Sequence, residues 1–436
     1  MARQENSAVR DALTSLMSPQ LIRRRASALG AVKRRRKVDI VSLVYTLVLG
    51  FDRGAGRTLA SLRRAYVSTA GVTLAPSAFY DRFTPQLAEL MRQLTAHALE
   101  QLSRGTSKLE LALAAFTKVF IADGSLIRLS DTLEAHYPSV WTNHTKASLK
   151  LHVIMNGATR TPEIVRIAPG SQHDLTLMSV GPFCRGKLLL FDLAYYQGKL
   201  FRKIIEHGGH FLCRVKKDAN FRVVQAEKNI WIGRRHKELM DEMQGTSFEV
   251  VVDYQYRQIP DGDRQKRHLR LRLIAVWCAE VGRHRLYLTS ATPTQLSAKA
   301  APAIYAMRWE IELLFRELKS QLRLEDMPSG NKAAAECLVY AALLALALGR
   351  KVHRTLTARR RDPLSFRCPN ERWTAIFRAL APLLLELLLA SPRRRIQLER
   401  RLRTTLEYEA PDPNRKRIHL VQKARDCLLP ATTTAA

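Results

Sequence analysis

The order of apolar segments in the middle of the chain constrains the fold more than any other feature. Short β-rich runs, each typical of a buried strand, are predicted at residues 118–122, 149–155, 163–168, 187–191 and 211–215. Helical segments are predicted from His173-Asp174 onward and at 194–206. Asn156-Gly157 predicts a hairpin turn between the second and third strands. Three strands, then helix, strand, helix and strand predict a mixed sheet with helices on its faces.

This order is that of a ribonuclease-H-like α/β fold, and it divides the chain into three expected parts. We expect a helical DNA-binding domain at 1–110 and a ribonuclease-H-like catalytic core at 111–325. A β-rich insertion is expected within the core at about 218–300, because partly alternating runs such as FEVVVDYQYRQ occur there. Residues 326–436 are expected to form a helical, basic C-terminal region.

Two aspartates follow predicted strands of this core. Asp123 comes directly after the first strand, and Asp192 directly after the fourth. Open α/β sheets place ligands at the carboxyl ends of their strands, and the first and fourth strands are neighbours in the ribonuclease-H order. We therefore expect the two side chains to converge. The alternatives are that Asp123 opens a turn with Gly124 and that Asp192, like Asp174, caps a helix.

The segment 305–319, YAMRWEIELLFRELK, predicts one amphipathic helix. Its apolar stripe consists of Ile304, Met307, Ile311, Leu314 and Leu318. Beside this stripe, helical geometry groups the polar residues Tyr305, Arg308, Glu312 and Lys319. This polar group is either a solvated face with intrahelical ion pairs, such as Glu312 with Arg316, or part of a functional site.

Asp123, Asp192 and Glu312 would form a metal site if the helix packs on the same sheet. Three adjacent carboxylates repel one another, and divalent cations compensate that charge. Mg²⁺ prefers oxygen ligands, and two such ions roughly 3.5–4 Å apart support in-line phosphoryl displacement. Arg308 and Lys319 would then hold a DNA phosphate.

The charge of the whole chain points to a polyanionic partner. Lys and Arg number 71 against 39 Asp and Glu, which gives a formal charge of +32 over 436 residues. The simplest partner is nucleic acid, with an anionic membrane surface or ribosomal RNA as the rival. Basic runs lie at 23–25, 33–37, 393–395, 400–403 and 415–417. The N-terminal helices could read bases through a helix-turn-helix element or touch phosphates alone.

Cysteine usage and hydropathy indicate a cytoplasmic protein. The six cysteines are scattered without a CxxC pair, which argues against a zinc ribbon or a disulfide framework. The N-terminus has no apolar signal segment. The longest apolar runs, at 338–348 and 380–390, are too short to span a bilayer, and we expect buried helices and no membrane partner.

The spacing Tyr305, Arg308, Glu312 and Lys319 resembles the Tyr-Arg-Glu-Lys signature of insertion-sequence DDE transposases. IADGSLIRL resembles the first-Asp strand of that family, and LLLFDLAYY its second-Asp block. LKLHV and PGSQHDLTLM are similar to its middle strands, and LYLTSA to the strand before the signature helix. The resemblance covers roughly residues 115–325.

The resemblance implies a retroviral-integrase-like core and cut-and-paste transposition of an insertion sequence. It implies paired transposon ends, first-strand nicking, usually a hairpin intermediate, and strand transfer into double-stranded target DNA. Carried over by position, Asp123, Asp192 and Glu312 bind two Mg²⁺ ions, with Mn²⁺ as the substitute. Tyr305, Arg308 and Lys319 handle DNA near the cleaved end. The implied assembly is a homodimer on DNA, located in the cytoplasm at the nucleoid.

Two positions depart from the family pattern. Ala194 stands where the second-Asp block often has Gly, and Arg285 stands four residues before Thr289, where relatives carry Trp. Two other functional classes remain beside the active transposase. One is a catalytically inactive DNA-binding relative that represses transposition, and the other is a structure-specific nuclease that cuts without joining.

Overall fold

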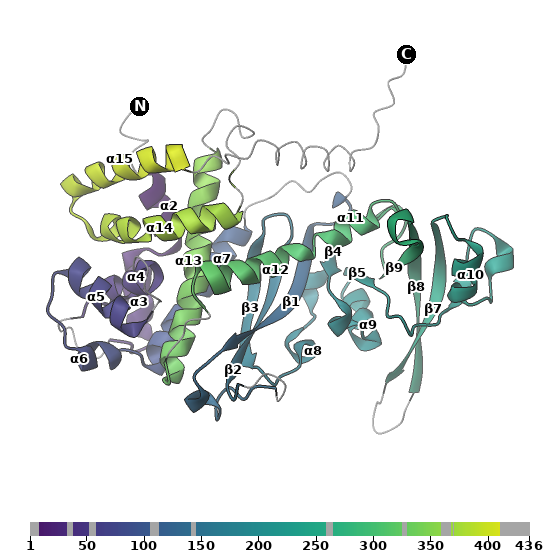
Figure 1. Cartoon of the computed structure of the whole chain (residues 1–436). Coiled ribbons are helices and arrows are strands. Elements are labelled where there is room, and N and C mark those ends of the chain that lie inside the picture. Colours follow the sequence, from purple (N-terminus) through teal and green to yellow (C-terminus); the bar gives the residue numbers. More distant parts are fainter. Residues whose placement is uncertain are drawn as a thin grey trace, which may run out of the picture.

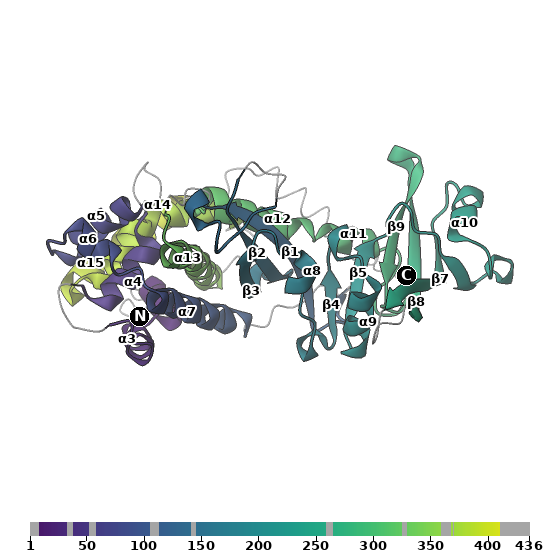
Figure 2. The ribbon, with the colours of Figure 1, turned by 90° about the horizontal axis from the view of Figure 1, so that it is seen from below.

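The computed structural model describes residues 8–409 except 33–37, 52–57, 105–112, 141–144, 259–264, 325–328, 359–367 and 369. The molecule is elongated, with helices from both ends of the chain gathered at one end and the β-rich insertion at the other (Figures 1 and 2). A mixed sheet joins the two. The protein is therefore a mixed α/β protein, as its strand pattern predicts.

Nine strands from the described residues form one sheet in the order β3-β2-β1-β4-β5-β9-β8-β7-β6. The strands are β1 Lys118–Arg128, β2 Ser148–Asn156, β3 Thr161–Pro169, β4 Lys187–Leu190, β5 His210–Arg214, β6 Arg222–Gln225, β7 Phe248–Gln258, β8 Gln265–Cys278 and β9 Arg283–Thr289. β1, β4 and β5 run parallel, whereas β1, β2 and β3 alternate in direction. All five strands expected in the core are present, and so is the hairpin that joins β2 to β3 after Asn156.

The insertion does not form a separate sheet. Its strand β9 pairs antiparallel with β5, with Leu212 opposite Thr289, and β8, β7 and β6 follow outward. Sequence periodicity shows that strands exist in this segment but not which edge they join. The edge of β5 carries unpaired backbone groups that must find partners, and β9 supplies them. The insertion is thus an extension of the central sheet.

The two faces of the sheet bury different sets of side chains. Val119, Ile121 and Leu190 point to the face that the helices of both chain ends cover. Phe191 and Phe211 point to the other face, where helix α9 (Gly198–Glu206) covers them with Phe201. The rings of Phe201 and Phe211 stack 4.3 Å apart. This alternation along each strand fixes which residues can face a common site.

The helices of the two chain ends share one hydrophobic core. At the N-terminal end they are α2 Ala8–Leu16, α3 Pro19–Ala28, α4 Ile40–Leu49, α5 Leu59–Ala70, α6 Pro76–Tyr80 and α7 Pro85–Ser103. At the C-terminal end they are α13 Lys332–Ala358, α14 Asn370–Leu389 and α15 Pro392–Glu409. α13 packs against α7, α2 and α4, and α14 packs against α4. The Tyr45 hydroxyl in α4 donates to the carbonyl of Met17 at 3.0 Å.

Helix α13 is long and apolar enough to cross a membrane by length and composition. However, 83% of its most apolar window is buried inside the protein. It is the central helix of the bundle, with Leu343, Leu344 and Leu348 fully enclosed. Its apolar character is therefore explained by packing against the surrounding helices.

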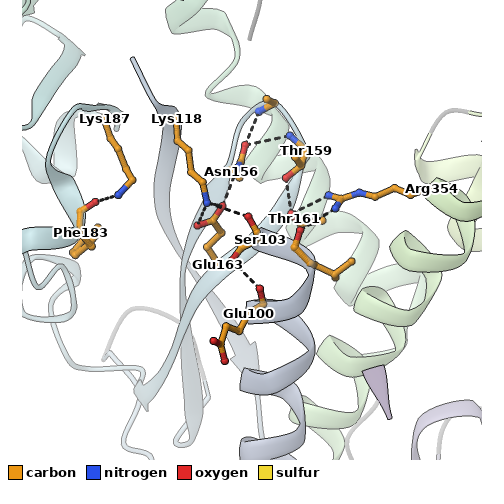
Figure 3. A network of polar contacts seen from close by, with 12 residues as sticks. Glu100, Ser103, Lys118, Asn156, Thr159, Thr161, Glu163, Phe183, Lys187 and Arg354 are labelled. Carbon is orange, nitrogen blue, oxygen red and sulfur yellow. Dashed lines mark hydrogen bonds and ion pairs between the residues drawn. The ribbon is translucent and has the colours of Figure 1, made fainter. Parts of the chain in front are cut away.

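A polar network joins the helices to the start of the sheet (Figure 3). The Lys118 ammonium on β1 donates to both Glu163 carboxylate oxygens on β3, at 2.8 and 2.9 Å. Asn156 donates to the same carboxylate at 2.8 Å. Arg354 on α13 donates to the Leu102 carbonyl at 3.0 Å, which connects α13 with α7. These bonds tie β1 and β3 to each other and the two ends of the chain together.

The basic runs and the cysteines are only partly within the described residues. Arg23–Arg25 lie on α3, where Arg25 donates to the Gln93 carbonyl at 2.8 Å, and 393–395 and 400–403 lie on α15. The runs 33–37 and 415–417 lie outside the described residues. Five described cysteines are free thiols, and Cys427 lies outside the description. We find no disulfide among those five.

Replacing Glu163 by Met should lower the free energy of unfolding by about 2–4 kcal/mol, because it leaves the partly buried Lys118 without its carboxylate. Urea denaturation followed by circular dichroism would measure this. The matched control is Glu206→Met, which removes an exposed ion pair with Arg202 and should change stability little. Equal effects of the two variants would contradict a structural role for the network.

Candidate active site

The register of two neighbouring strands places Asp123 and Asp192 side by side. β1 and β4 are parallel, and Ile121 is the residue opposite Leu190. β4 ends at Leu190, and the same register continued two residues further along each chain brings Asp123 opposite Asp192. The two carboxylates are close enough to interact electrostatically. Neighbouring strands lie about 4.8 Å apart. Because Ile121 and Leu190 belong to the core on the helix-covered face, strand alternation turns both aspartates toward that face.

The two aspartates are held by their local backbone. β1 continues through Asp123 to Arg128, so the expectation that Asp123 ends a strand or opens a turn is wrong. What ends there is the parallel pairing with β4, while the pairing with β2 goes on. Asp192 does cap a turn, since its Oδ1 accepts from the Ala194 amide at 2.8 Å. No positive φ occurs at Ala194, so this turn accommodates Ala in place of Gly.

The segment expected to be one helix consists of three pieces. They are α11 Ala301–Ala306, α12 Trp309–Arg316 and a π-turn at Glu317–Gln321. The break is a tighter turn, in which the Arg308 amide donates to the Tyr305 carbonyl at 3.0 Å. The apolar stripe faces the core as predicted: Ile304, Ile311, Leu314 and Leu318 are buried and Met307 is partly buried. The stripe places α12 against β1.

This packing brings Glu312 to Asp123. Asp123, Gly124 and Ser125 line a hollow of about 360 Å³ together with Glu312, Phe315, Arg316, Lys319 and Ser320. Asp192 is not among the lining residues, although it adjoins Asp123 on the sheet. The hollow therefore joins a carboxylate of the sheet, the carboxylate of α12 and the Lys319 ammonium. Three of the six predicted site residues thus meet at one surface.

The other three predicted residues lie around this hollow. Arg308 donates to Glu312 Oε1 at 2.7 Å, and both side chains are partly buried. The Tyr305 ring packs edge-on against Tyr287 of β9 with centroids 5.5 Å apart. Burial raises the pKa of Tyr305 to about 12, so its hydroxyl stays protonated. It can therefore donate a hydrogen bond to an anionic group.

Burial raises the pKa of Asp123 to about 6. The amide of Gly124, which donates to its Oδ1 at 2.8 Å, and the Arg308 cation oppose this rise. The neighbouring Asp192 and Asp174 carboxylates add to it. Burial is the largest cause of the raised pKa, because it disfavours the charged form, and repulsion from the neighbouring carboxylates is a smaller one. A cation bound at Asp123 would therefore stabilise its ionised form and offset the repulsion from the neighbouring carboxylates.

Two residues near the site were not assigned a role from the sequence. Asp174 pairs with Lys150 at 3.2 Å, and its carboxylate occupies the space that a side chain on residue 124 would need. A larger residue than Gly124 would make the Asp174 side chain move. Arg214 on β5 lies over the Tyr287 ring, 5.6 Å from its centroid. In the sequence, Asp174 is an acidic residue at the start of a helix and Arg214 a basic residue at the end of a strand. Both patterns are common at protein surfaces, so neither residue stands out.

The donor chemistry of the site suits a hard divalent cation. Carboxylate oxygens are the preferred ligands of Mg²⁺, and the buried Asp123 beside Asp192 provides them. Among the residues that the structure describes, no three His, Cys, Asp or Glu side chains are grouped closely enough to hold a metal ion. Glu312 is held by Arg308 instead.

Comparisons with known proteins agree on one family. The family model described as transposase DDE domain matches residues 114–348, more than half of the chain. The transposase for insertion sequence element IS231F of Bacillus thuringiensis subsp. israelensis is 21% identical over 373 residues, covering 77% of this chain and 78% of that protein. The putative transposase y4zB of Sinorhizobium fredii is 27% identical, covering 51% of this chain and 60% of that one.

A solved structure, the piggyBac transposase synaptic complex with hairpin DNA, has a TM-score of 0.44 and 11% identity to this chain. The likeness covers 93% of this chain and 85% of that one.

The raised pKa of Asp123 predicts how stability depends on pH. Between its ordinary pKa of 3.8 and about 6, the folded protein binds more protons than the unfolded chain, so the free energy of unfolding falls as pH rises through this window. Asp123→Asn removes that effect. Without divalent cations, the variant should be more stable than wild type at pH 8, and the difference should shrink at pH 4. Urea denaturation at both pH values tests this, with the exposed Asp81→Asn as control.

Proposed function

The chain belongs to the transposase DDE-domain family and is a DNA transposase, and we propose that Asp123, Asp192 and Glu312 are its catalytic carboxylates. The observation that carries this proposal is the strand register, which sets Asp123 opposite Asp192 on the face where α12 presents Glu312. Packing alone does not explain why acidic residues gather there. Burial disfavours the ionised form of Asp123, as its raised pKa shows, and a second carboxylate beside it adds to that cost.

We propose that residues 111–325 form a ribonuclease-H-like core, extended by the insertion. Three antiparallel strands followed by two parallel ones, in the order β3-β2-β1-β4-β5, support this. The helix α8 (Asp174–Leu177) after β3 and α9 after β4 fit the same order. The insertion falls between the second aspartate and Glu312, which is where the resemblance places it.

The three carboxylates would hold Mg²⁺, as two ions, with Mn²⁺ able to substitute. When bound, the metal supplies activation of a water or 3′-hydroxyl and stabilises the leaving oxygen of the phosphodiester. Arg308 bonds to Oε1 of Glu312, so Glu312 could become a ligand through Oε2 or by releasing Arg308. A released Arg308 guanidinium could bind a phosphate through two parallel hydrogen bonds. Lys319, in the same hollow, adds a point charge for the DNA backbone, and Tyr305 donates from its protonated hydroxyl.

The substrates we propose are the terminal inverted repeats of its own insertion sequence and a double-stranded target. The charge of +32 fits such a partner. A homodimer on DNA would hold the two ends, and the protein would work in the cytoplasm at the nucleoid, with no membrane partner. The alternative, an inactive relative that represses transposition, would bind the ends without cutting them.

Glu312→Gln should abolish Mg²⁺-dependent cleavage of the DNA ends that flank the protein's own gene. We expect a loss of at least about 100-fold, with end binding retained, because the amide cannot replace a carboxylate ligand. A gel assay of labelled ends measures cleavage and binding. Asp123→Asn and Asp192→Asn should behave alike.

The matched control is Glu310→Gln on the same helix, whose carboxylate pairs with Arg160 at 2.8 Å outside the hollow. It should cleave at nearly the wild-type rate. Cleavage retained by Glu312→Gln would remove Glu312 from the site. Binding without cutting by every protein, wild type included, would favour the repressor.

Binding of the ends should weaken steeply with salt, since phosphate contacts release counterions. With six or more such contacts, affinity should fall about 10³-fold or more between 50 and 200 mM salt. Arg308→Ala should reduce the log–log slope by about one, measured by fluorescence anisotropy. The exposed Arg202→Ala on α9 should leave the slope unchanged. A flat response would contradict a phosphate-dominated interface.

A further inference from the structure

Glu317, a buried carboxylate in the segment 305–319, has no part in the metal and phosphate binding proposed above. Glu317 follows Glu312 by five residues and is 4% exposed. Its Oε2 accepts from Arg350 of α13 at 2.5 Å, and Arg350 is also 4% exposed. Its Oε1 accepts from the Thr374 hydroxyl of α14. Glu317 thus joins two C-terminal helices to the element that carries the active-site carboxylate.

The backbone at this point is a π-turn. The Leu322 amide donates to the Glu317 carbonyl at 3.1 Å, a bond that spans five residues. Such wide turns are rare and occur mostly as single turns in helices. At the far end of the same turn, Arg378 of α14 donates to the Gln321 carbonyl at 3.3 Å. Side chains of the C-terminal helices therefore hold both ends of the turn.

Between these two anchors lie the residues that face the hollow. Lys319 and Ser320 line it together with Asp123 and Glu312. Glu312 and Lys319 are seven residues apart, and in a regular α-helix such residues lie nearly above one another on one face. The π-helical segment Glu317–Gln321 contains Lys319, and its wider turn changes the direction of Lys319 relative to Glu312. Figure 1 shows α12 running from the sheet to the helical bundle that holds α13 and α14.

Stability alone does not account for the ion pair. Burying two charges costs desolvation free energy that their attraction often fails to exceed, and apolar residues of similar size commonly stabilise as well or better. What a buried pair does provide in some proteins is a fixed register between two elements. Here the elements are the end of the signature segment and the helices α13 and α14.

We propose that Glu317, Arg350, Thr374 and Arg378 form a clamp that positions Lys319 relative to Glu312 in the active site. Arg378 and Arg350 are positioning residues: they touch the turn and not the hollow. This inference rests on the proposed function for its catalytic consequence. It assigns to the C-terminal helices a direct role in the geometry of the site.

The test is a double-mutant cycle in the full-length protein, with first-strand cleavage of the DNA ends in Mg²⁺ as readout. Arg378→Ala should slow cleavage about tenfold while end binding is retained, an effect within the usual range for coupled residues. In a Lys319→Ala background, Arg378→Ala should cause no further loss, because the residue through which it acts is gone. Arg378→Lys keeps a donor and should restore part of the rate.

Two further variants complete the design. Thr374→Val removes the hydroxyl that binds Glu317 with little change of volume, and it should couple to Lys319 in the same way. Arg394→Ala is the matched control, since Arg394 bonds to Glu386 near the end of α14 and does not touch the turn. It should cleave at the wild-type rate.

Hydrogen exchange tests the clamp independently of activity. In Arg378→Ala the Leu322 amide should exchange at least about tenfold faster, whereas amides within α12 keep their protection. Additive losses in the cycle, or an unchanged Leu322 amide, would overturn the proposal. If wild type cuts no DNA, the proposed function fails, and the exchange rates still decide whether the clamp holds the turn.

Discussion

The parallel pairing of β1 and β4 is the constraint on which the site depends. Its last pair is Ile121 with Leu190. Continued two residues further, this register brings Asp123 opposite Asp192, and strand alternation turns both toward the face that the helices cover. A shift by one residue in β4 would turn Asp192 into the core of Phe191 and Phe201. Phe191, the residue before Asp192, is buried on that side and stacks on Phe201 and Phe211 with ring centroids 6.0 Å apart, which opposes such a shift.

Helix α12 packs against this sheet and is also connected to the C-terminal helices. The apolar stripe of α12 binds it to the sheet, and its continuation through Glu317 binds it to α13 and α14. The position of Glu312 on α12 therefore depends both on the sheet and on the helices α13 and α14. Because the bundle also contains the N-terminal helices, both ends of the chain contribute to the placement of one carboxylate.

Charge balance explains why these groups lie as they do. Burial, and to a smaller extent the acidic neighbours Asp192 and Asp174, raise the pKa of Asp123, while Arg308 pairs with Glu312. Clustered like charges need such compensation in a folded protein. The excess of positive charge elsewhere in the chain serves a different purpose, which is to attract DNA from a distance.

The sequence by itself determined the five core strands, their order along the chain and the core-facing stripe of α12, because hydrophobic periodicity is a local property. Motif spacing, which is also local, selected the candidate residues of the site. The sequence did not determine that β1 runs past Asp123, that Arg308 donates to Glu312, or that the helix breaks and widens. It also gave no sign that β9 joins β5, or that Glu317 meets Arg350, 33 residues away. Those outcomes depend on which surfaces meet in space, and only the tertiary structure decides that, since unpaired strand edges and buried charges find their partners through the packing of distant segments.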